Sequence, residues 1–225
     1  SLIHAGTENE VKVNVKFIHS EYLDKENINK ELIDLDGIIV APGFGQRGLD
    51  GKILAVEYAR VNKIPFLGIC LGMQMAVIEY ARNVKKIRYA NSTEISEKCK
   101  DPVIDLMTSQ KEIINKGGTM RLGAWDCEIL KNTISNKIYS KKVVSERHRH
   151  RYEFNDEYSK KIFDENFIVA GKNPETNLVE IVENKDHPWF VGVQYHPEYK
   201  STVENPHPLF VSFVRAGLEY KKTRN

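Results

Sequence analysis

Cys70 occupies a position from which a cysteine could act as a nucleophile. It follows a continuously apolar run at residues 65–69, which predicts a buried strand, and it precedes apolar residues at helical spacing. Gly68 and Gly72 flank it in a G-x-C-x-G pattern, the cysteine form of a nucleophile elbow, in which small neighbours permit a sharp turn. We expect the positive end of the helix to favour the thiolate, and the N–H of Leu71 to bind an oxyanion.

A second segment supplies the partners that a nucleophilic cysteine needs. Residues 190–195 predict an apolar strand, His196 follows it directly, and Glu198 comes two residues later. An imidazole can serve as base and as leaving-group acid, and a carboxylate can orient it. The alternative is that Cys70 is a packing residue, because free cysteines are among the most buried residues. His196 and Glu198 favour the catalytic interpretation.

The composition indicates one domain, residues 1–225, with a balanced surface charge. The chain has 33 Lys and Arg against 31 Asp and Glu, which gives no general case for binding nucleic acid or a membrane. The basic run at residues 147–151, within the stretch 146–154, is explained most simply as a two-faced polar strand or a solvated basic face.

Apolar runs are too short for a membrane span, and the first residues lack the features of a secretory signal. Three irregularly spaced cysteines, Cys70, Cys99 and Cys127, fit neither a disulfide framework nor a zinc site and favour a reducing compartment.

Alternating strand and helix patterns predict an α/β fold. We expect a mostly parallel central sheet flanked by helices, with a small antiparallel addition. The predicted strands are residues 11–17, 38–40, 65–69, 117–123, 127–130, 146–154, 167–170, 179–182 and 190–195, of which 117–123 and 127–130 form a hairpin. The predicted helices are residues 1–5 (closed by Gly6), 25–32, 52–61, 73–80 and 208–220. Residues 83–115 are assigned only connections and short strands.

A glycine-rich loop at residues 41–48 follows the strand predicted at residues 38–40. Its sequence, APGFGQRG, matches neither the dinucleotide nor the Walker A glycine pattern. The loops after parallel strands share one edge of the sheet, so this loop should face the turn at Cys70. Gly43 could then offer a second N–H group to the oxyanion. Pro42 has no N–H and cannot do so.

Taken together, these stretches resemble the triad-type, class I glutamine amidotransferases, and the chain is similar to the glutaminase domains of the CTP synthases. The matching stretches span nearly the whole chain in the family's order: GFGQRG at 43–48, LGICLGMQ at 67–74, ANSTE at 90–94, GGTMRLG at 117–123, ERHRHRYE at 146–153 and VQYHPE at 193–198. The elbow alone marks the superfamily, whereas GGTMRLG and RHRHR are more specific. The family commonly has glycine where this chain has Pro42.

The resemblance implies a role for each matching residue. Cys70 would be the nucleophile, His196 the general acid and base, and Glu198 the group that orients the imidazole. Gly43 and Leu71 would form the oxyanion hole. The same two residues and Gly72, Met73, Gln74, Glu94, Arg151 and Tyr152 would bind glutamine. A carboxylate such as Glu94 suits the α-ammonium group. Phe44 and Arg47 match a flexible lid at which GTP acts as an activator.

The resemblance also implies partners beyond this domain. Glutamine would be hydrolysed through a γ-glutamyl thioester without a metal or cofactor. Ammonia would then pass to a synthetase domain that uses ATP and Mg²⁺ to aminate UTP to CTP. That domain and a first strand of the fold would precede Ser1. We expect a cytoplasmic homo-oligomer, a tetramer by resemblance, with no nucleic-acid or membrane partner.

Two alternatives remain open at this stage. The chain could be the glutaminase of another synthetase or a γ-glutamyl hydrolase of the same fold, against which the family-specific stretches argue. It could also be a non-catalytic regulatory module of the same fold. The presence of Cys70, His196 and Glu198 together argues against that second alternative.

Overall fold

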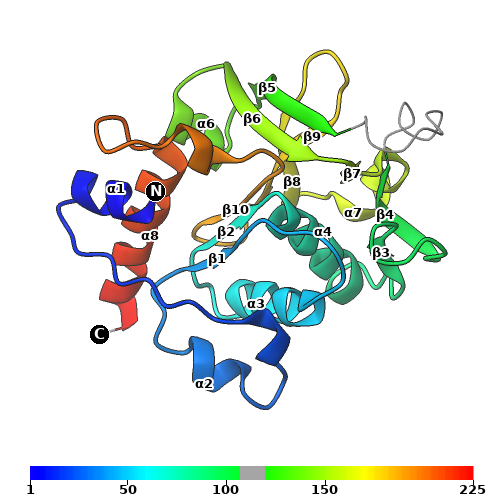
Figure 1. Cartoon of the computed structure of the whole chain (residues 1–225), viewed down its shortest axis with the longest axis horizontal. Helices are drawn as coiled ribbons and strands as arrows, with labels where there is room; N and C mark the ends of the chain where they lie inside the picture. Colours follow the sequence, from blue (N-terminus) through cyan, green and yellow to red (C-terminus); the bar gives the residue numbers. More distant parts are fainter. Residues whose placement is uncertain (107–119, 225) are drawn as a thin grey trace.

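Short runs of β-branched and aromatic residues form a seven-stranded sheet at the centre of the computed structural model (Figure 1). The structure describes residues 1–106 and 120–224. The strands lie in the order β1 (Ile38–Val40), β2 (Phe66–Ile69), β10 (Phe190–Val193), β9 (Val179–Asn184), β8 (Phe167–Lys172), β5 (Arg121–Ile129) and β6 (Val143–His150). A smaller sheet contains β3 (Ala90–Ser92), β4 (Asp101–Leu106) and β7 (Tyr152–Phe154).

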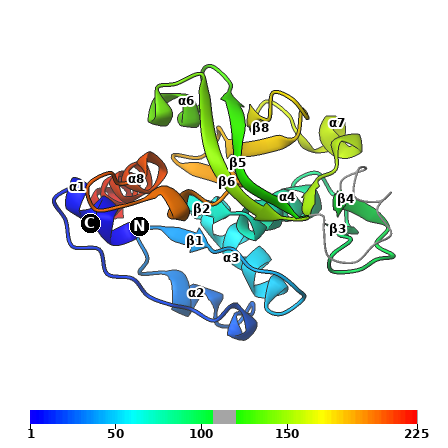
Figure 2. The same cartoon turned by 45° about the horizontal axis from the view of Figure 1, so that its top comes forward.

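The expected α/β fold is confirmed, and the large sheet is mixed. Parallel pairing within it is limited to β1, β2 and β10. The remaining neighbours pair in antiparallel fashion, so the antiparallel part is larger than expected. Figure 2 shows β5 and β6 as a long ribbon, which is joined to the sheet through β8 at the edge opposite β1.

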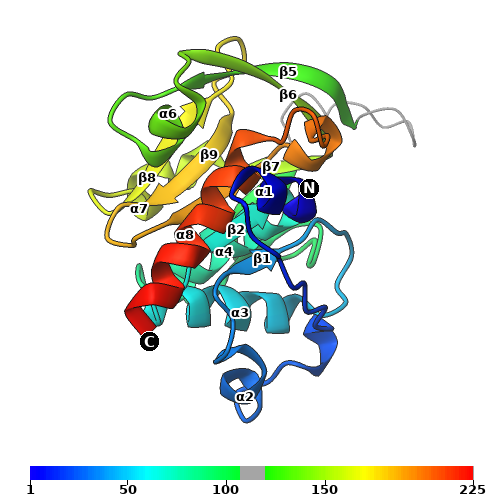
Figure 3. The same ribbon diagram turned by 90° about the vertical axis from the view of Figure 1, so that its left-hand side faces the viewer.

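Helices cover both faces of the parallel part of the sheet (Figure 3). The helices are α1 (Leu2–Glu8), α2 (Ile28–Leu32), α3 (Leu49–Val61), α4 (Leu71–Asn83), α6 (Ile134–Tyr139), α7 (Ser159–Ile162) and α8 (Pro208–Arg224), with 3-10 turns η1 (Ser20–Tyr22), η2 (Asp156–Tyr158) and η3 (Pro197–Lys200). Alternate side chains of β2 feed two apolar clusters: Phe66 packs with α3 and α4, and Leu67 packs with α1 and α8. Both faces of the sheet are therefore buried at β2, as the continuously apolar run predicted.

Three predicted local structures are wrong. Residues 11–17 form no strand; Val11 and Val13 pack against the α1 and α8 cluster, while Val15 and Phe17 are exposed. The first helix continues through Gly6 instead of ending there. A Cβ on Gly6 would lie 2.8 Å from the Val13 side chain and 2.9 Å from the Val11 carbonyl oxygen, so the glycine serves close packing.

The hairpin predicted from residues 117–123 and 127–130 is the third error. Residues 117–119 lie outside the described part of the chain, and residues 121–129 form the single strand β5, paired along its length with β6. Gly123 takes a positive φ of 85° inside this strand instead of forming a turn. Periodicity identified the segment as extended but could not exclude a turn at this glycine.

Among the described residues, no helix has the length and apolarity needed to cross a bilayer.

The first turn of α4 packs directly against the end of β1. A Cβ on Gly72 would lie 2.0 Å from the carbonyl oxygen of Val40, a distance at which backbone atoms must move. Gly45 gives a matched comparison, because its Cβ would have open space although its φ of +76° disfavours a side chain.

We expect Gly72→Ala to lower the free energy of unfolding by about 3 kcal/mol or more, because the added methyl overpacks a backbone contact. Gly45→Ala should cost only the strain of a left-handed residue, about 1–2 kcal/mol. Chemical denaturation of both variants checks this. Equal losses for the two variants would show that the close approach of α4 and β1 is not what requires Gly72.

Candidate active site

The turn between β2 and α4 has the sharp geometry that the glycine pattern predicts. Cys70 adopts φ 51° and ψ −103°, a conformation that non-glycine residues seldom take. Its N–H donates to the carbonyl of Val193 on β10 at 2.8 Å, and its carbonyl accepts from the N–H of Gln74 at 3.2 Å. A Cβ on Gly68 would lie 2.7 Å from the backbone of Gly72. The elbow is thus fixed by its two glycines and by hydrogen bonds on both sides.

Cys70 opens into a pocket of about 590 Å³ at the edge of the sheet. Nine of the residues predicted for the site line this pocket: Gly43, Phe44, Cys70, Leu71, Gln74, Glu94, Arg151, Tyr152 and His196. Gly72 and Met73 are buried behind the lining, and Arg47 pairs with Glu21 outside it (Nε–Oε1 2.8 Å). The chain thus brings together most of the predicted site from segments far apart in sequence.

His196 is positioned by three contacts. Its Nδ1–H donates to Glu198 Oε1 at 2.6 Å, and its backbone N–H donates to the carbonyl of Arg147 on β6 at 2.8 Å. The ring of Tyr199 stacks on the imidazole with centroids 4.9 Å apart and planes 8° apart. Nε2 is buried and has no hydrogen-bond partner among the described residues. The ring therefore has its orientation fixed through one nitrogen, and the other is available for proton transfer.

The electrostatic setting of Cys70 differs from the expectation. Burial, with smaller contributions from the carboxylates of Glu153, Glu198 and Glu94, raises the pKa of the thiol to about 12. The Leu71 N–H acts in the opposite direction by stabilising the thiolate, as predicted for a helix start, but it is the weaker effect. The expected preference for a thiolate is therefore wrong in its net direction.

The glycine-rich loop lies over the pocket and contacts Glu94. The N–H of Gly45 donates to Glu94 Oε1 at 3.2 Å, and the side chain of Gln46 donates to the Ile95 carbonyl at 2.7 Å. Phe44 lines the pocket although its side chain is 89% exposed. The loop therefore faces the Cys70 turn across the pocket, as the shared edge of the parallel strands predicted.

Gln74 is held by its own neighbours. Its Nε2 donates to the backbone carbonyl of Tyr152 at 3.0 Å and to Gln194 Oε1 at 3.2 Å. Gln194 in turn directs its Nε2 to Cys70 Sγ at 3.7 Å. This chain of contacts links the first turn of α4, the residue that follows β10 and the start of β7.

Sequence reasoning missed several residues of the pocket. Met120, Arg149, His150 and Tyr199 line it, and Gln194 lies against the thiol. The alternation of the RHRHR run contained a signal for His150, because one side of a two-faced strand must be buried. No pattern in the sequence pointed to Tyr199. Within residues 1–106 and 120–224, no three His, Cys, Asp or Glu side chains are grouped as metal ligands.

Comparison with known proteins places this geometry in a family. The model of the class-I glutamine amidotransferases matches residues 1–216. The chain is 62% identical over 220 residues to the CTP synthase of Christiangramia forsetii, covering 98% of this chain and 40% of the relative. It is 56% identical over 222 residues to the CTP synthase of Clostridium acetobutylicum, covering 99% of this chain and 42% of that protein. The chain therefore spans about two fifths of the length of these relatives.

Solved structures give the same result. The glutaminase domain of Trypanosoma brucei CTPS with bound acivicin matches with a TM-score of 0.91 and 38% identity, over 97% of this chain and 85% of that one. A glutamine amidotransferase from Thermotoga maritima shares the fold, with a TM-score of 0.50 at 15% identity over 91% and 94% of the two chains. The chain belongs to the class-I glutamine amidotransferase family, in the group of the CTP synthase glutaminase domains.

Proposed function

We propose that this chain hydrolyses the side-chain amide of glutamine, with Cys70 as the nucleophile. The observation that carries the proposal is the His196–Glu198 hydrogen bond, which leaves the buried Nε2 of His196 free in the pocket that Cys70 also lines. A thiol, an oriented imidazole and a carboxylate are the three groups that nucleophilic acyl transfer requires.

In the proposed first half, Cys70 Sγ attacks the amide carbon while its proton passes to His196 Nε2. The negative charge that develops on the amide oxygen accepts hydrogen bonds from the N–H groups of Gly43 and Leu71. When the C–N bond breaks, His196 returns the proton to the leaving nitrogen, and ammonia departs. The product on the enzyme is a γ-glutamyl thioester.

In the second half, His196 removes a proton from a water molecule, which attacks the thioester carbon. Collapse of the second tetrahedral intermediate releases glutamate and gives the proton back to Cys70. The raised pKa of the thiol fits this scheme, because His196 takes the thiol proton during attack and no standing thiolate is required. Glu198 stabilises the imidazolium that forms in both halves.

The polar groups of the pocket support glutamine as the substrate. Glu94 presents a carboxylate for the α-ammonium group, and its present contact with the Gly45 N–H is one that an ammonium could replace. The segment of Arg151 and Tyr152 offers backbone groups and a guanidinium for the α-carboxylate. The Arg151–Tyr152 side of the pocket and the Leu71 N–H at the start of α4 are supported by Gln74, Gly72 and Met73.

For the whole protein, we propose that residues 1–225 are one glutaminase domain joined to a synthetase domain, as in the CTP synthases. Ammonia would aminate UTP with ATP and Mg²⁺ bound to that other domain. Phe44 and Arg47 would form the lid at which GTP acts. The enzyme would be a cytoplasmic homo-oligomer, a tetramer by resemblance. The rival proposals, a glutaminase of another synthetase, a γ-glutamyl hydrolase or a regulatory module, predict no CTP formation.

The triad is tested by release of glutamate from glutamine. Cys70→Ala and His196→Ala should each lower the rate by about 10⁴-fold or more, and Glu198→Gln by about 10²–10⁴-fold, since the three groups act as a unit. Cys99→Ala is the control, because Cys99 lies outside the pocket lining. Retention of more than a tenth of the rate by Cys70→Ala would exclude this mechanism.

The raised pKa of Cys70 predicts the pH dependence of its alkylation by iodoacetamide. Only the thiolate reacts, and a pKa of about 12 leaves little of it at neutral pH. The rate should therefore rise about tenfold per pH unit from pH 7 to pH 10 in the absence of glutamine. Peptide mass spectrometry follows the adduct on Cys70. A rate that levels off below pH 9 would mean that the helix start outweighs burial.

The ammonia acceptor is tested in a chimaera that joins this chain to the synthetase part of the Christiangramia forsetii CTP synthase. With glutamine, ATP, Mg²⁺ and UTP, the chimaera should form CTP. The Cys70→Ala version should form CTP only when ammonium chloride replaces glutamine. Formation with ammonium but not with glutamine in the unmodified chimaera would favour a different acceptor for this domain.

A further inference from the structure

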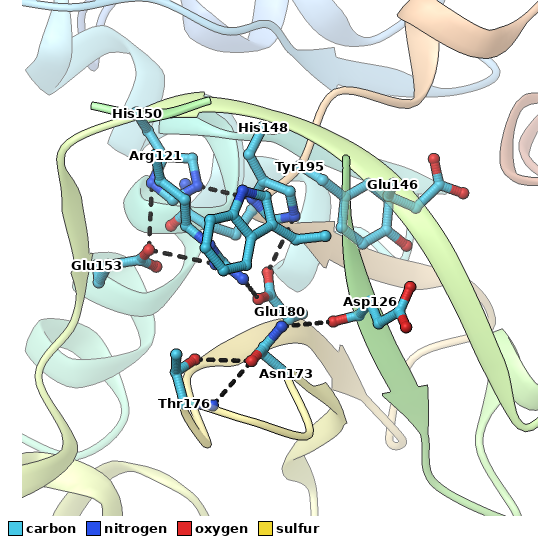
Figure 4. Close-up of polar contacts among 12 residues, drawn as sticks. Arg121, Asp126, Glu146, His148, His150, Glu153, Asn173, Thr176, Glu180 and Tyr195 are labelled. Carbon is cyan, nitrogen blue, oxygen red and sulfur yellow. Dashed lines mark hydrogen bonds and ion pairs between the residues drawn. The ribbon is translucent and has the colours of Figure 1, made fainter. Parts of the chain in front are cut away.

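Beside the pocket lies a buried cluster of five charged or titratable side chains, the Arg121 cluster (Figure 4). It consists of Arg121, His148, His150, Glu153 and Glu180, all between 0% and 6% exposed. Arg121 pairs with both carboxylates: Nη1 lies 3.3 Å from Glu153 Oε1, and Nη2 lies 2.6 Å from Glu180 Oε1. His148 and His150 share a hydrogen bond of 2.8 Å between ring nitrogens. Burying this many charged groups lowers the stability of a fold unless the charges are paired, so the placement of the cluster beside the pocket needs an explanation.

Arg121 pairs with both carboxyl groups of the cluster, and its guanidinium affects the pKa of the neighbouring groups. Burial and the guanidinium of Arg121 lower the pKa of His148 to about 2 and that of His150 to about 3, so both rings are neutral. Burial raises the pKa of Glu180 to about 7, and burial together with Glu180 raises that of Glu153 well above its usual range. Both carboxyl groups are therefore harder to ionise than exposed glutamates, and Glu153 also supplies an acceptor oxygen for Arg121.

The Arg121 cluster joins the two sheets. Arg121 is on β5, His148 and His150 are on β6, and Glu180 is on β9, all in the large sheet. Glu153 is on β7 of the small sheet, which pairs with β4. The chain crosses from one sheet to the other at Arg151, between β6 and β7. The contact of Glu153 with Arg121 therefore fixes the small sheet where the crossover passes the pocket.

The crossover is also the wall of the pocket. Arg151 and Tyr152 line it, and the Tyr152 carbonyl accepts from Gln74. On the far side of the cluster, the backbone carbonyl of Glu180 accepts the N–H of Gln194 at 2.9 Å, and Gln194 lies against Cys70. Arg121 thus contacts two carboxyl groups that are connected to the pocket. Glu153 is the residue after Tyr152, which lines the pocket. The backbone of Glu180 accepts the backbone N–H of Gln194, which lies against the thiol.

We propose that Glu153, held by Arg121, is a positioning residue that sets the distance of the Arg151–Tyr152 wall from Cys70 and thereby the binding of glutamine. This rests on the proposed function, because it assigns the wall to substrate binding. Glu153 does not line the pocket, and no step of the proposed mechanism uses it. Its effect should therefore appear in the KM for glutamine and leave kcat nearly unchanged.

The rival explanation is that Glu153 contributes to stability alone. Glu183 provides a matched control for it, being a similarly buried glutamate that accepts the N–H groups of Ile134 and Ser135 at the start of α6 (2.7 and 2.6 Å). It is not part of the pocket lining. A loss of stability at Glu183 should leave the KM for glutamine unchanged.

The experiment measures glutaminase kinetics and thermal unfolding of the chain and three variants. Glu153→Leu keeps the volume and removes the acceptor, and should raise the KM for glutamine about tenfold with kcat within about threefold. Glu153→Gln keeps an acceptor oxygen for Arg121 and should hold the KM within about threefold of that of the unmodified chain. Glu183→Leu should lower the unfolding temperature without raising the KM.

The outcomes separate this inference from the proposed function. Equal KM values for Glu153→Leu and Glu183→Leu would refute the positioning role while leaving the glutaminase intact. No glutamate release by the unmodified chain would overturn the proposed function, and this inference with it. If Glu153→Leu does not fold, Arg121→Met removes the contact with Glu153 from the β5 side, together with the contact with Glu180, and should raise the KM at least as much; an unchanged KM in that variant also counts against the proposal.

Discussion

The structure depends on a contact that leaves no room for side chains, between the end of β1, the turn at Cys70 and the first turn of α4. Gly68 and Gly72 allow the backbone of α4 to lie against β1 and β2 at distances that a Cβ would prevent. This approach forces Cys70 into its positive φ and directs its thiol toward the pocket that the glycine-rich loop borders. The proposed nucleophile, the proposed oxyanion donor from Leu71 and the loop that carries Gly43 are brought together by this one packing constraint.

The electrostatic environment of Cys70 sets a second requirement for its reaction, which is a base that removes the thiol proton. Burial and, to a smaller extent, nearby carboxylates raise the pKa of the Cys70 thiol to about 12, so the proposed attack by Cys70 requires a base. In the proposed mechanism that base is His196, which is hydrogen-bonded to Glu198 and stacked on Tyr199. Such an arrangement keeps the thiol unreactive towards general electrophiles while a correctly bound amide meets all the groups at once. Binding geometry then controls the reaction, which gives weight to the residues that set the pocket walls.

The sequence predicted what depends on local rules. The elbow followed from two glycines around Cys70, the parallel core from the buried run before it, and the meeting of loop and turn from the shared strand edge. What failed depended on tertiary partners. Residues 11–17 alternate like a strand but lie against helices, and Gly123 is accommodated within β5. The pKa of Cys70 depends on burial and on carboxylates such as Glu153, distant in sequence. The Arg121 cluster joins four strands, which no single pattern could reveal.

The measurement that tests the central claim most directly is intact mass spectrometry of the chain after treatment with acivicin, the compound bound in the Trypanosoma brucei glutaminase domain. The account predicts a single adduct on Cys70, suppressed by excess glutamine and absent from Cys70→Ala. Protection by glutamine would establish the nucleophile and the substrate pocket together. No adduct, or equal labelling of Cys99 and Cys127, would contradict the account, because the elbow would then not present a nucleophile to a glutamine-shaped ligand.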